Sequence, residues 1–147
     1  MRSAIVRRPL DAAALMAEVA GARHGAVILF VGTVRESNEG RMVTGIEYSA
    51  YDAMAERELA GILAEVAAAH EGVDMVVEHR VGELAIGDAS VVVAVAHAHR
   101  GEAYAASRQV IEELKRRVPI WKREHYADGT REWVHAHSTA SVVEAGT

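Results

Sequence analysis

Apolar and polar residues follow two different periods along this chain, and each change of period marks the end of a secondary-structure element. Residues 26–34 form a nearly continuous apolar run rich in β-branched side chains, which is typical of a buried strand. Residues 43–51 alternate between apolar and polar positions and predict a second strand. The polar, glycine-bearing segment between these strands, residues 35–41, predicts an exposed loop.

Three segments carry the helical period. Residues 52–70 place apolar side chains three to five positions apart, with charged side chains between them. Residues 101–118 repeat this pattern up to Pro119, because a proline disfavours the α conformation in the residue before it. The short segment 12–20 follows Asp11, whose carboxylate can cap a helix N-terminus, and stops before a glycine.

Four further apolar stretches predict strands. They are residues 73–84, 89–99, 120–126 and 131–134, and residues 127–130 form a turn between the last two. A helix followed by two strands, repeated three times, favours an α+β domain with about three helices and a mainly antiparallel sheet over a parallel doubly wound fold.

Length and composition restrict the domain organisation and the possible kinds of site and partner. A chain of 147 residues with no internal linker predicts a single domain over residues 1–137, followed by a tail over residues 138–147. The absence of cysteine excludes disulfides, thiolate metal sites and a cysteine nucleophile. A formal net charge of −5 disfavours a nucleic-acid partner. No apolar run approaches the ~20 residues of a membrane span, so we expect a soluble cytoplasmic protein with no membrane partner.

A basic cluster surrounds Pro119 and extends from Lys115 to Arg123. Cations in the last turn of a helix are favoured by the helix dipole, which explains the first half of the cluster without any function. Lys122 is less easily explained, since it follows a tryptophan in an extended, partly packed segment. A lysine desolvated by apolar neighbours can act as a general acid or base.

The histidines offer a second candidate chemistry. His97 and His99 point to the same face if both lie in one strand, and His135 and His137 repeat the spacing. Each pair lacks a further ligand in the same short pattern, which disfavours a metal site. His99 and Arg100 also lie just before a predicted helix N-terminus, where a phosphate would be stabilised.

Arg35 ends the apolar strand at residues 26–34, and a solvated strand end explains a lone arginine there. We expect it to bind an anion only if the fold brings its side chain next to the other basic groups.

Four short motifs along the chain together resemble the pattern of one protein family. They are FVGTVRESNEG (30–40), AHAHRGEAY (96–104), LKRRVPIWKRE (114–124) and GTREWV (129–134). Together they resemble the large, catalytic subunit of molybdopterin synthase, the MoaE family, over about residues 5–137. The resemblance implies an α/β hammerhead-type fold and an enzyme of molybdenum cofactor biosynthesis. Such an enzyme converts cyclic pyranopterin monophosphate (precursor Z) to molybdopterin by installing two sulfurs as a dithiolene.

The resemblance also implies partners. A small ubiquitin-like sulfur carrier of the MoaD family delivers sulfur as a thiocarboxylate on its C-terminal Gly-Gly tail, and the large subunit forms a homodimer with one carrier at each end. No resident cofactor or metal is implied. An absent cysteine is compatible with this sulfur chemistry, because the partner supplies the sulfur.

Site residues carry over from the family motifs. The resemblance assigns catalysis to Lys115 and Lys122, and substrate binding to Arg35, His99, Arg100 and His137. Family members often have an arginine in place of His137 that reaches the neighbouring subunit's pocket; here the histidine, Arg131 or another cation serves instead. We expect Lys115, Lys122, Arg35 and His99 to surround one pocket.

Two other functions remain open from the residues alone. One is a metal-dependent hydrolase that uses the two His-x-His pairs. The other is a non-catalytic binding module for a ubiquitin-like protein, in which the lysines only hold its tail.

Overall fold

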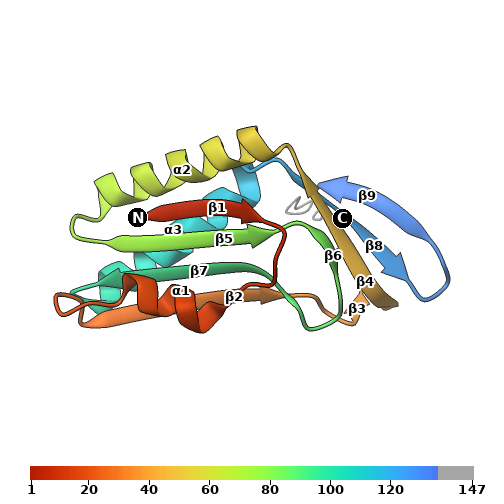
Figure 1. The fold of residues 1–147 in the computed structure, drawn as a ribbon, viewed down its shortest axis with the longest axis horizontal. Coiled ribbons are helices and arrows are strands. Elements are labelled where there is room, and N and C mark those ends of the chain that lie inside the picture. The colour runs from red at the N-terminus through yellow and green to blue at the C-terminus, as the bar shows by residue number, and fades with distance from the viewer. Residues whose placement is uncertain (136–147) are drawn as a thin grey trace.

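The computed structural model describes residues 1–135, apart from the side chains of Glu132 and His135. Its centre is a four-stranded sheet in the order β1-β5-β7-β2 (Figure 1). The strands are β1 (Arg2–Val6), β5 (Asp74–Arg80), β7 (Ala89–His97) and β2 (Ala26–Thr33). β1 and β5 run parallel, whereas β5–β7 and β7–β2 are antiparallel. Within this part of the chain, no helix is long and apolar enough to cross a membrane.

Three helices cover the two faces of this sheet. They are α1 (Ala12–Val19), α2 (Asp52–Ala69) and α3 (Arg100–Arg117). Leu15 and Val19 of α1 pack on one face, against small and β-branched side chains of β5 and β7. The buried stripes of α2 and α3 pack on the other. The central strands β5 and β7 are therefore buried on both faces, which explains the valine-rich, nearly continuous apolar run of β7.

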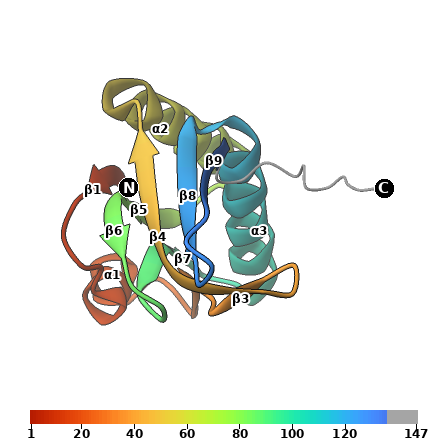
Figure 2. The same cartoon turned by 90° about the vertical axis from the view of Figure 1, so that its right-hand side faces the viewer.

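A second sheet stands at one end of the first (Figure 2). It contains β3 (Ser37–Asn38), β4 (Arg41–Ala50), β8 (Ile120–Tyr126) and β9 (Arg131–His135) in that order, and β6 (Gly82–Leu84) also pairs with β4. Ile46 and Ile120 of this sheet join the same core as α2 and α3. The two sheets thus share one hydrophobic core.

The α+β class, the three helices and the mainly antiparallel pairing are confirmed. Asp11 caps α1 by accepting a hydrogen bond from the N–H of Ala14 at 3.0 Å. α3 ends at Arg117, and Val118 before Pro119 has extended backbone angles. The predicted tail over residues 138–147 lies outside the described residues, so the domain boundary stays a prediction.

The structure corrects three details of the sequence prediction. The N-terminal segment forms β1, which the short run of apolar residues did not reveal. The single strand expected over residues 73–84 is two strands in different sheets, because the chain turns at Gly82, whose φ is 103°. The loop expected over residues 35–41 contains β3 and a tight hairpin turn.

Residue His79 on β5 makes stability depend on pH. It is fully buried, its Nδ1–H donates to the Arg80 carbonyl oxygen at 3.0 Å, and burial lowers the pKa of the imidazole from 6.5 to about 4. The unfolded chain takes up this proton near pH 6.5, whereas the folded chain does so only near pH 4. The free energy of unfolding should therefore fall by about 3 kcal/mol as the pH drops through this window.

Urea unfolding at several values between pH 7 and pH 4 measures this loss. In His79→Gln the loss should be smaller by about that amount, while His24→Gln, at a half-buried histidine, serves as the control. Curves for His79→Gln and the wild type that stay parallel over the whole range would contradict the assignment.

Candidate active site

A small polar pocket of about 70 Å³ lies where the end of β2 meets the second sheet. We call it the lysine pocket; its lining residues are Thr33, Val34, Arg35, Ser37, Asn38, Val43, Ile46, Tyr48, Lys122 and Glu124. The structure therefore brings two of the expected residues, Arg35 and Lys122, to one place. Its volume corresponds to about two water molecules, so it suits a small terminal group better than a whole ring system.

Strand alternation determines which β8 side chains enter this pocket. Lys122 and Glu124 are two positions apart and share one face of β8, while the intervening Arg123 points to the other face. Antiparallel pairing sets Lys122 directly opposite Tyr48 on β4. The floor of the lysine pocket is thus built by the register of these two strands.

Lys122 and Glu124 form an ion pair in the lysine pocket. Lys122 Nζ lies 2.9 Å from Glu124 Oε1, and the exposed fractions of the two side chains are 25% and 6%. Burial by itself would raise the pKa of the Glu124 carboxyl, but hydrogen bonds from Lys122 and two neutral donors outweigh it and hold this pKa below its usual value. With Arg35 and Lys122 against Glu124, the pocket carries a net positive charge and favours an anion.

Tyr48 completes the buried side of the lysine pocket. Its side chain is nearly buried, and its hydroxyl donates a hydrogen bond to Ser90 Oγ, because the Ser90 hydroxyl itself donates to the Gly32 carbonyl oxygen at 3.3 Å. Burial raises the pKa of this hydroxyl above its usual range, so it stays neutral at physiological pH. The ring packs edge-on against His79, with 5.3 Å between the ring centroids.

The other two described candidates, His99 and Arg100, line a different and larger pocket. This helix pocket has a volume of about 630 Å³ and is lined by Gly25, Ala98, His99, Arg100, Gly101 and Tyr104. It lies at the N-terminus of α3, where no side chain caps the first-turn N–H groups. Such a helix end favours anions, and an added arginine and histidine strengthen that preference.

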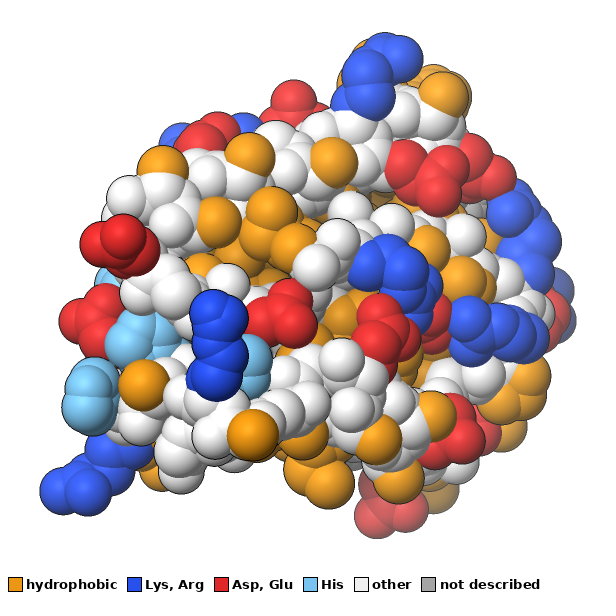
Figure 3. All heavy atoms as spheres, turned by 60° about the vertical axis from the view of Figure 1, so that its left-hand side comes forward, with side chains coloured by type: hydrophobic (Ala, Val, Ile, Leu, Met, Phe, Trp, Pro, Cys, Tyr) orange, Lys and Arg blue, Asp and Glu red, His pale blue; other side chains and the backbone are white. Residues whose placement is uncertain are grey.

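Two backbone segments, at Gly25 and at Ala98, approach each other closely at the helix pocket. A Cβ on Gly25 would lie 2.6 Å from the carbonyl oxygen of Ala98, so only glycine fits there. Figure 3 shows histidine side chains gathered with acidic and basic ones on one side of the face it presents. Two pairs of side chains near this end interact: His70 bonds to Glu102 at 3.0 Å, and the His97 and His99 rings lie 5.9 Å apart.

The expectation of one pocket for all these residues is wrong within a single chain. The helix pocket adjoins the start of β2 at Gly25 and the lysine pocket its end at Thr33, which is about 26 Å away along an extended strand. Helix α3 gives a similar measure, since Arg100 and Lys115 are separated by about 22 Å along its axis. The two pockets occupy opposite ends of the molecule.

Lys115 lines neither pocket. It is exposed on the last turn of α3, at the same end of the helix as β8, and makes no ion pair within residues 1–135. Its neighbour Arg117, by contrast, bridges α3 to Glu58 and Glu65 of α2. The basic cluster at this helix end is thus partly structural, through ion pairs between α3 and α2. His137 lies outside the described residues.

The histidine pairs are not arranged as metal ligands where the structure describes them. Nε2 of His97 donates to the Glu71 carbonyl oxygen at 3.0 Å, and its Nδ1 accepts from the His99 N–H at 3.0 Å. Both ring nitrogens of His97 are therefore occupied. The second pair, His135 and His137, has no described side chain.

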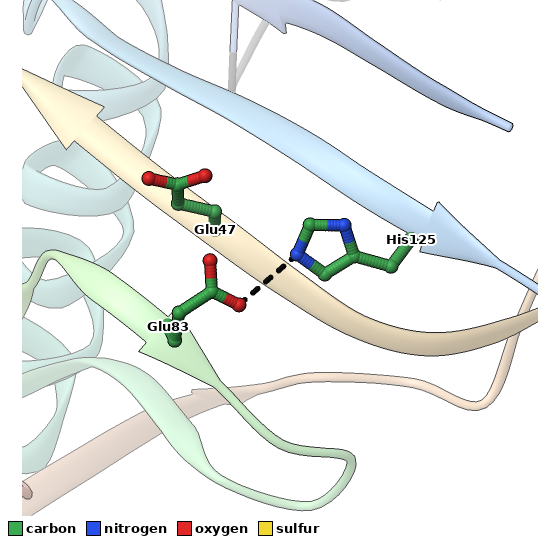
Figure 4. A group of neighbouring side chains, drawn as sticks. All are labelled: Glu47, Glu83 and His125. Carbon is green, nitrogen blue, oxygen red and sulfur yellow. Dashed lines mark hydrogen bonds and ion pairs between the residues drawn. The ribbon is translucent and has the colours of Figure 1, made fainter. Parts of the chain in front are cut away.

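A different group has the donors of a metal site. Glu47 of β4, Glu83 of β6 and His125 of β8 hold ligand atoms within 4.8 Å of one another (Figure 4). These groups already have partners, since His125 Nε2 lies 3.0 Å from Glu83 and Arg123 lies 2.6 Å from Glu47. The arginine neutralises one carboxylate and competes with a cation, so we interpret the cluster as a cross-strand ion-pair network.

Sequence reasoning missed Glu124, Asn38 and Tyr48 at the lysine pocket. The i, i+2 spacing of Lys122 and Glu124 in a predicted strand was a usable signal that they share a face. Asn38 and Tyr48 come from distant segments, and only the tertiary structure brings them to β8.

Comparison with known proteins identifies the fold. The family model described as MoaE protein matches residues 5–117. This chain belongs to the MoaE family. A curated relative from Mycobacterium tuberculosis, named molybdopterin synthase catalytic subunit 1, is 45% identical over 127 residues, which are 86% of each chain. The crystal structure of molybdopterin synthase from Staphylococcus aureus matches with a TM-score of 0.85 at 37% identity, over 89% of this chain and 95% of that one.

A more distant MoaE-like fold comes from Helicobacter pylori. That structure is a protein–protein complex of subunits 1 and 2 of molybdopterin-converting factor, and it matches with a TM-score of 0.76 at 23% identity, over 97% of this chain and 99% of that one. The MoaE match of this chain ends at Arg117, before Lys122 and Glu124. The role of Lys122 therefore rests on the motif at residues 114–124 together with the geometry of the lysine pocket, and that of Glu124 rests on the geometry.

Proposed function

We propose that this chain is the catalytic subunit of a molybdopterin synthase. It transfers sulfur from the C-terminal thiocarboxylate of a small ubiquitin-like carrier to cyclic pyranopterin monophosphate, precursor Z, and so forms the molybdopterin dithiolene. The observation that carries this proposal is a MoaE fold in which Lys122 and Arg35 share one small, positively charged pocket.

The lysine pocket suits the sulfur-donating end of the carrier. A thiocarboxylate is a small anion, and the pocket has room for little more than such a group. Cations that hold it lower its repulsion from an anionic substrate. Lys122 then moves protons at the reacting carbon and oxygen atoms, and Lys115 lies on the same end of α3 to meet the incoming tail.

The helix pocket suits the substrate. Its volume of about 630 Å³ lies within the usual range for small-molecule sites. His99, Arg100 and the free N–H groups of α3 provide donors for the cyclic phosphate.

Because the two pockets lie at opposite ends of one chain, we propose that the reaction uses two copies. A homodimer sets the helix pocket of one copy beside the lysine pocket of the other, so that each complete site contains residues of both. His137, which takes the place of an arginine that reaches a neighbouring subunit in the family, then belongs to the same shared site. The complex of two subunits in the Helicobacter pylori neighbour supports a second, different subunit as partner. The cytoplasmic location stays a prediction.

Reconstitution tests the function directly. Purified chain, precursor Z and a thiocarboxylated small carrier should together yield the dithiolene, and omission of the chain should abolish its formation. A carrier that ends in an ordinary carboxylate is the matched control and should give none. Equal dithiolene formation with and without the chain would reject the proposed function.

A further inference from the structure

One side chain of the β3–β4 hairpin reaches the ion pair in the lysine pocket. Asn38 Nδ2 donates to Glu124 Oε2 at 3.0 Å and lies 3.2 Å from the Tyr126 hydroxyl. A carboxylate only accepts hydrogen bonds, so the NH₂ end of the amide must face it. The Glu124 carboxylate thus determines which end of the Asn38 amide faces it.

Glu124 has three side-chain partners for its two oxygens: Lys122, Asn38 and the Tyr126 hydroxyl. Oε1 holds Lys122 Nζ at 2.9 Å, and Oε2 accepts from Asn38. The Glu124 side chain is buried, so water cannot readily replace a lost donor. These bonds restrain the rotation of the carboxylate, and Asn38 is the partner among them that comes from outside β8, so the position of Lys122 Nζ depends in part on its amide.

The hairpin holds Asn38 in place. Glu39 and Gly40 both have positive φ, 51° and 79°, as in a two-residue turn that matches the twist of its strands. Asn38 pairs with Arg41 across this turn, and the Arg41 guanidinium lies 3.5 Å from the centre of the Tyr126 ring. The hairpin is therefore anchored to β8 by a contact that does not involve Glu124.

We propose that Asn38 is a positioning residue for the sulfur-transfer reaction: it locks the Glu124 carboxylate so that this carboxylate holds Lys122 Nζ at the reacting group. This role rests on the proposed function of the chain. It adds a third member, on a separate strand, to the Lys122–Glu124 pair, in the way that a general base is oriented by a further group.

Removal of the amide should affect turnover more than binding. In Asn38→Ala, kcat for dithiolene formation should fall about tenfold to a hundredfold, as expected for a lost hydrogen bond to a charged group. KM for precursor Z and for the carrier should stay within about twofold, because Asn38 makes its described side-chain bonds inside the protein. Asn38→Asp should lose at least as much, since it sets a second carboxylate beside Glu124.

The pH dependence separates positioning from folding. Asn38 is one of the groups that hold the pKa of Glu124 down, together with Lys122 and Tyr126 on β8; Tyr48 on β4 and Arg35 after β2 also face the pocket. The acid limb of the kcat profile should move to higher pH in Asn38→Ala and further in Asn38→Asp. Carbon-detected NMR titration of the Glu124 carboxyl should move in the same direction without any need for activity.

Arg41→Ala is the matched control, because it loosens the same hairpin without touching Glu124. Its acid limb and its Glu124 titration should move less than those of Asn38→Ala, because Asn38 keeps its hydrogen bond to Glu124, even if its melting temperature falls further. An active wild type whose kcat and Glu124 titration are unchanged in Asn38→Ala overturns the role of Asn38 and leaves the function intact. A wild type that forms no dithiolene overturns both.

Discussion

Replacement of Lys122 by alanine should lower the rate of dithiolene formation by about a hundredfold to ten-thousandfold, the usual contribution of a positioned proton-transfer group. Lys122 Nζ is the basic atom in the lysine pocket that Glu124 holds in place, 2.9 Å from its Oε1. Single-turnover assays with a thiocarboxylated carrier measure the chemical step apart from product release.

Two companion variants sharpen this test. Lys122→Arg keeps a cation beside Glu124 but cannot give up a proton near neutral pH, so it should also be slow. Arg123→Ala changes the next residue, which points to the opposite face of β8 and pairs with Glu47, and should stay within about twofold of the wild type. A Lys122→Ala chain that binds the carrier and works at the normal rate would remove Lys122 from the chemistry.

Mixing of two inactive variants should restore activity. Lys122→Ala damages the lysine pocket and Arg100→Ala the helix pocket. If each site joins one pocket from each copy, then a mixed dimer has one complete site and one that is doubly damaged. Random reassociation of equal amounts should therefore recover about a quarter of the wild-type activity. Each variant alone should stay near its own background rate.

The double variant Lys122→Ala/Arg100→Ala is the matched control. When it is mixed in equal amounts with the wild type, a shared site leaves activity only in the wild-type dimers, about a quarter of the all-wild-type value. A site confined to one chain would leave about half. Absence of recovery in the first mixture together with one half in the second would contradict the shared site and leave the enzymatic function in place.

Elements with a strong local signal could be read from the sequence. The cap at Asp11, the stop at Pro119 and the apolar period of α2 and α3 act over a few residues, and the structure confirms them. β1 and β3 are short, and their stability comes from pairing with distant strands. The split at Gly82 depends on which sheet each half joins, which no local pattern encodes.

By itself the sequence determined the α+β class, the family and the kinds of residue available for the reaction. Those are set by local periodicity and by short motifs, each contained in one segment. Only the tertiary structure decided how these residues are grouped. It joined Asn38, Lys122 and Glu124 through strand register, and it separated His99 and Arg100 from them by the length of α3. Side-chain chemistry is a local property, whereas the distance between two side chains depends on the fold of everything between them.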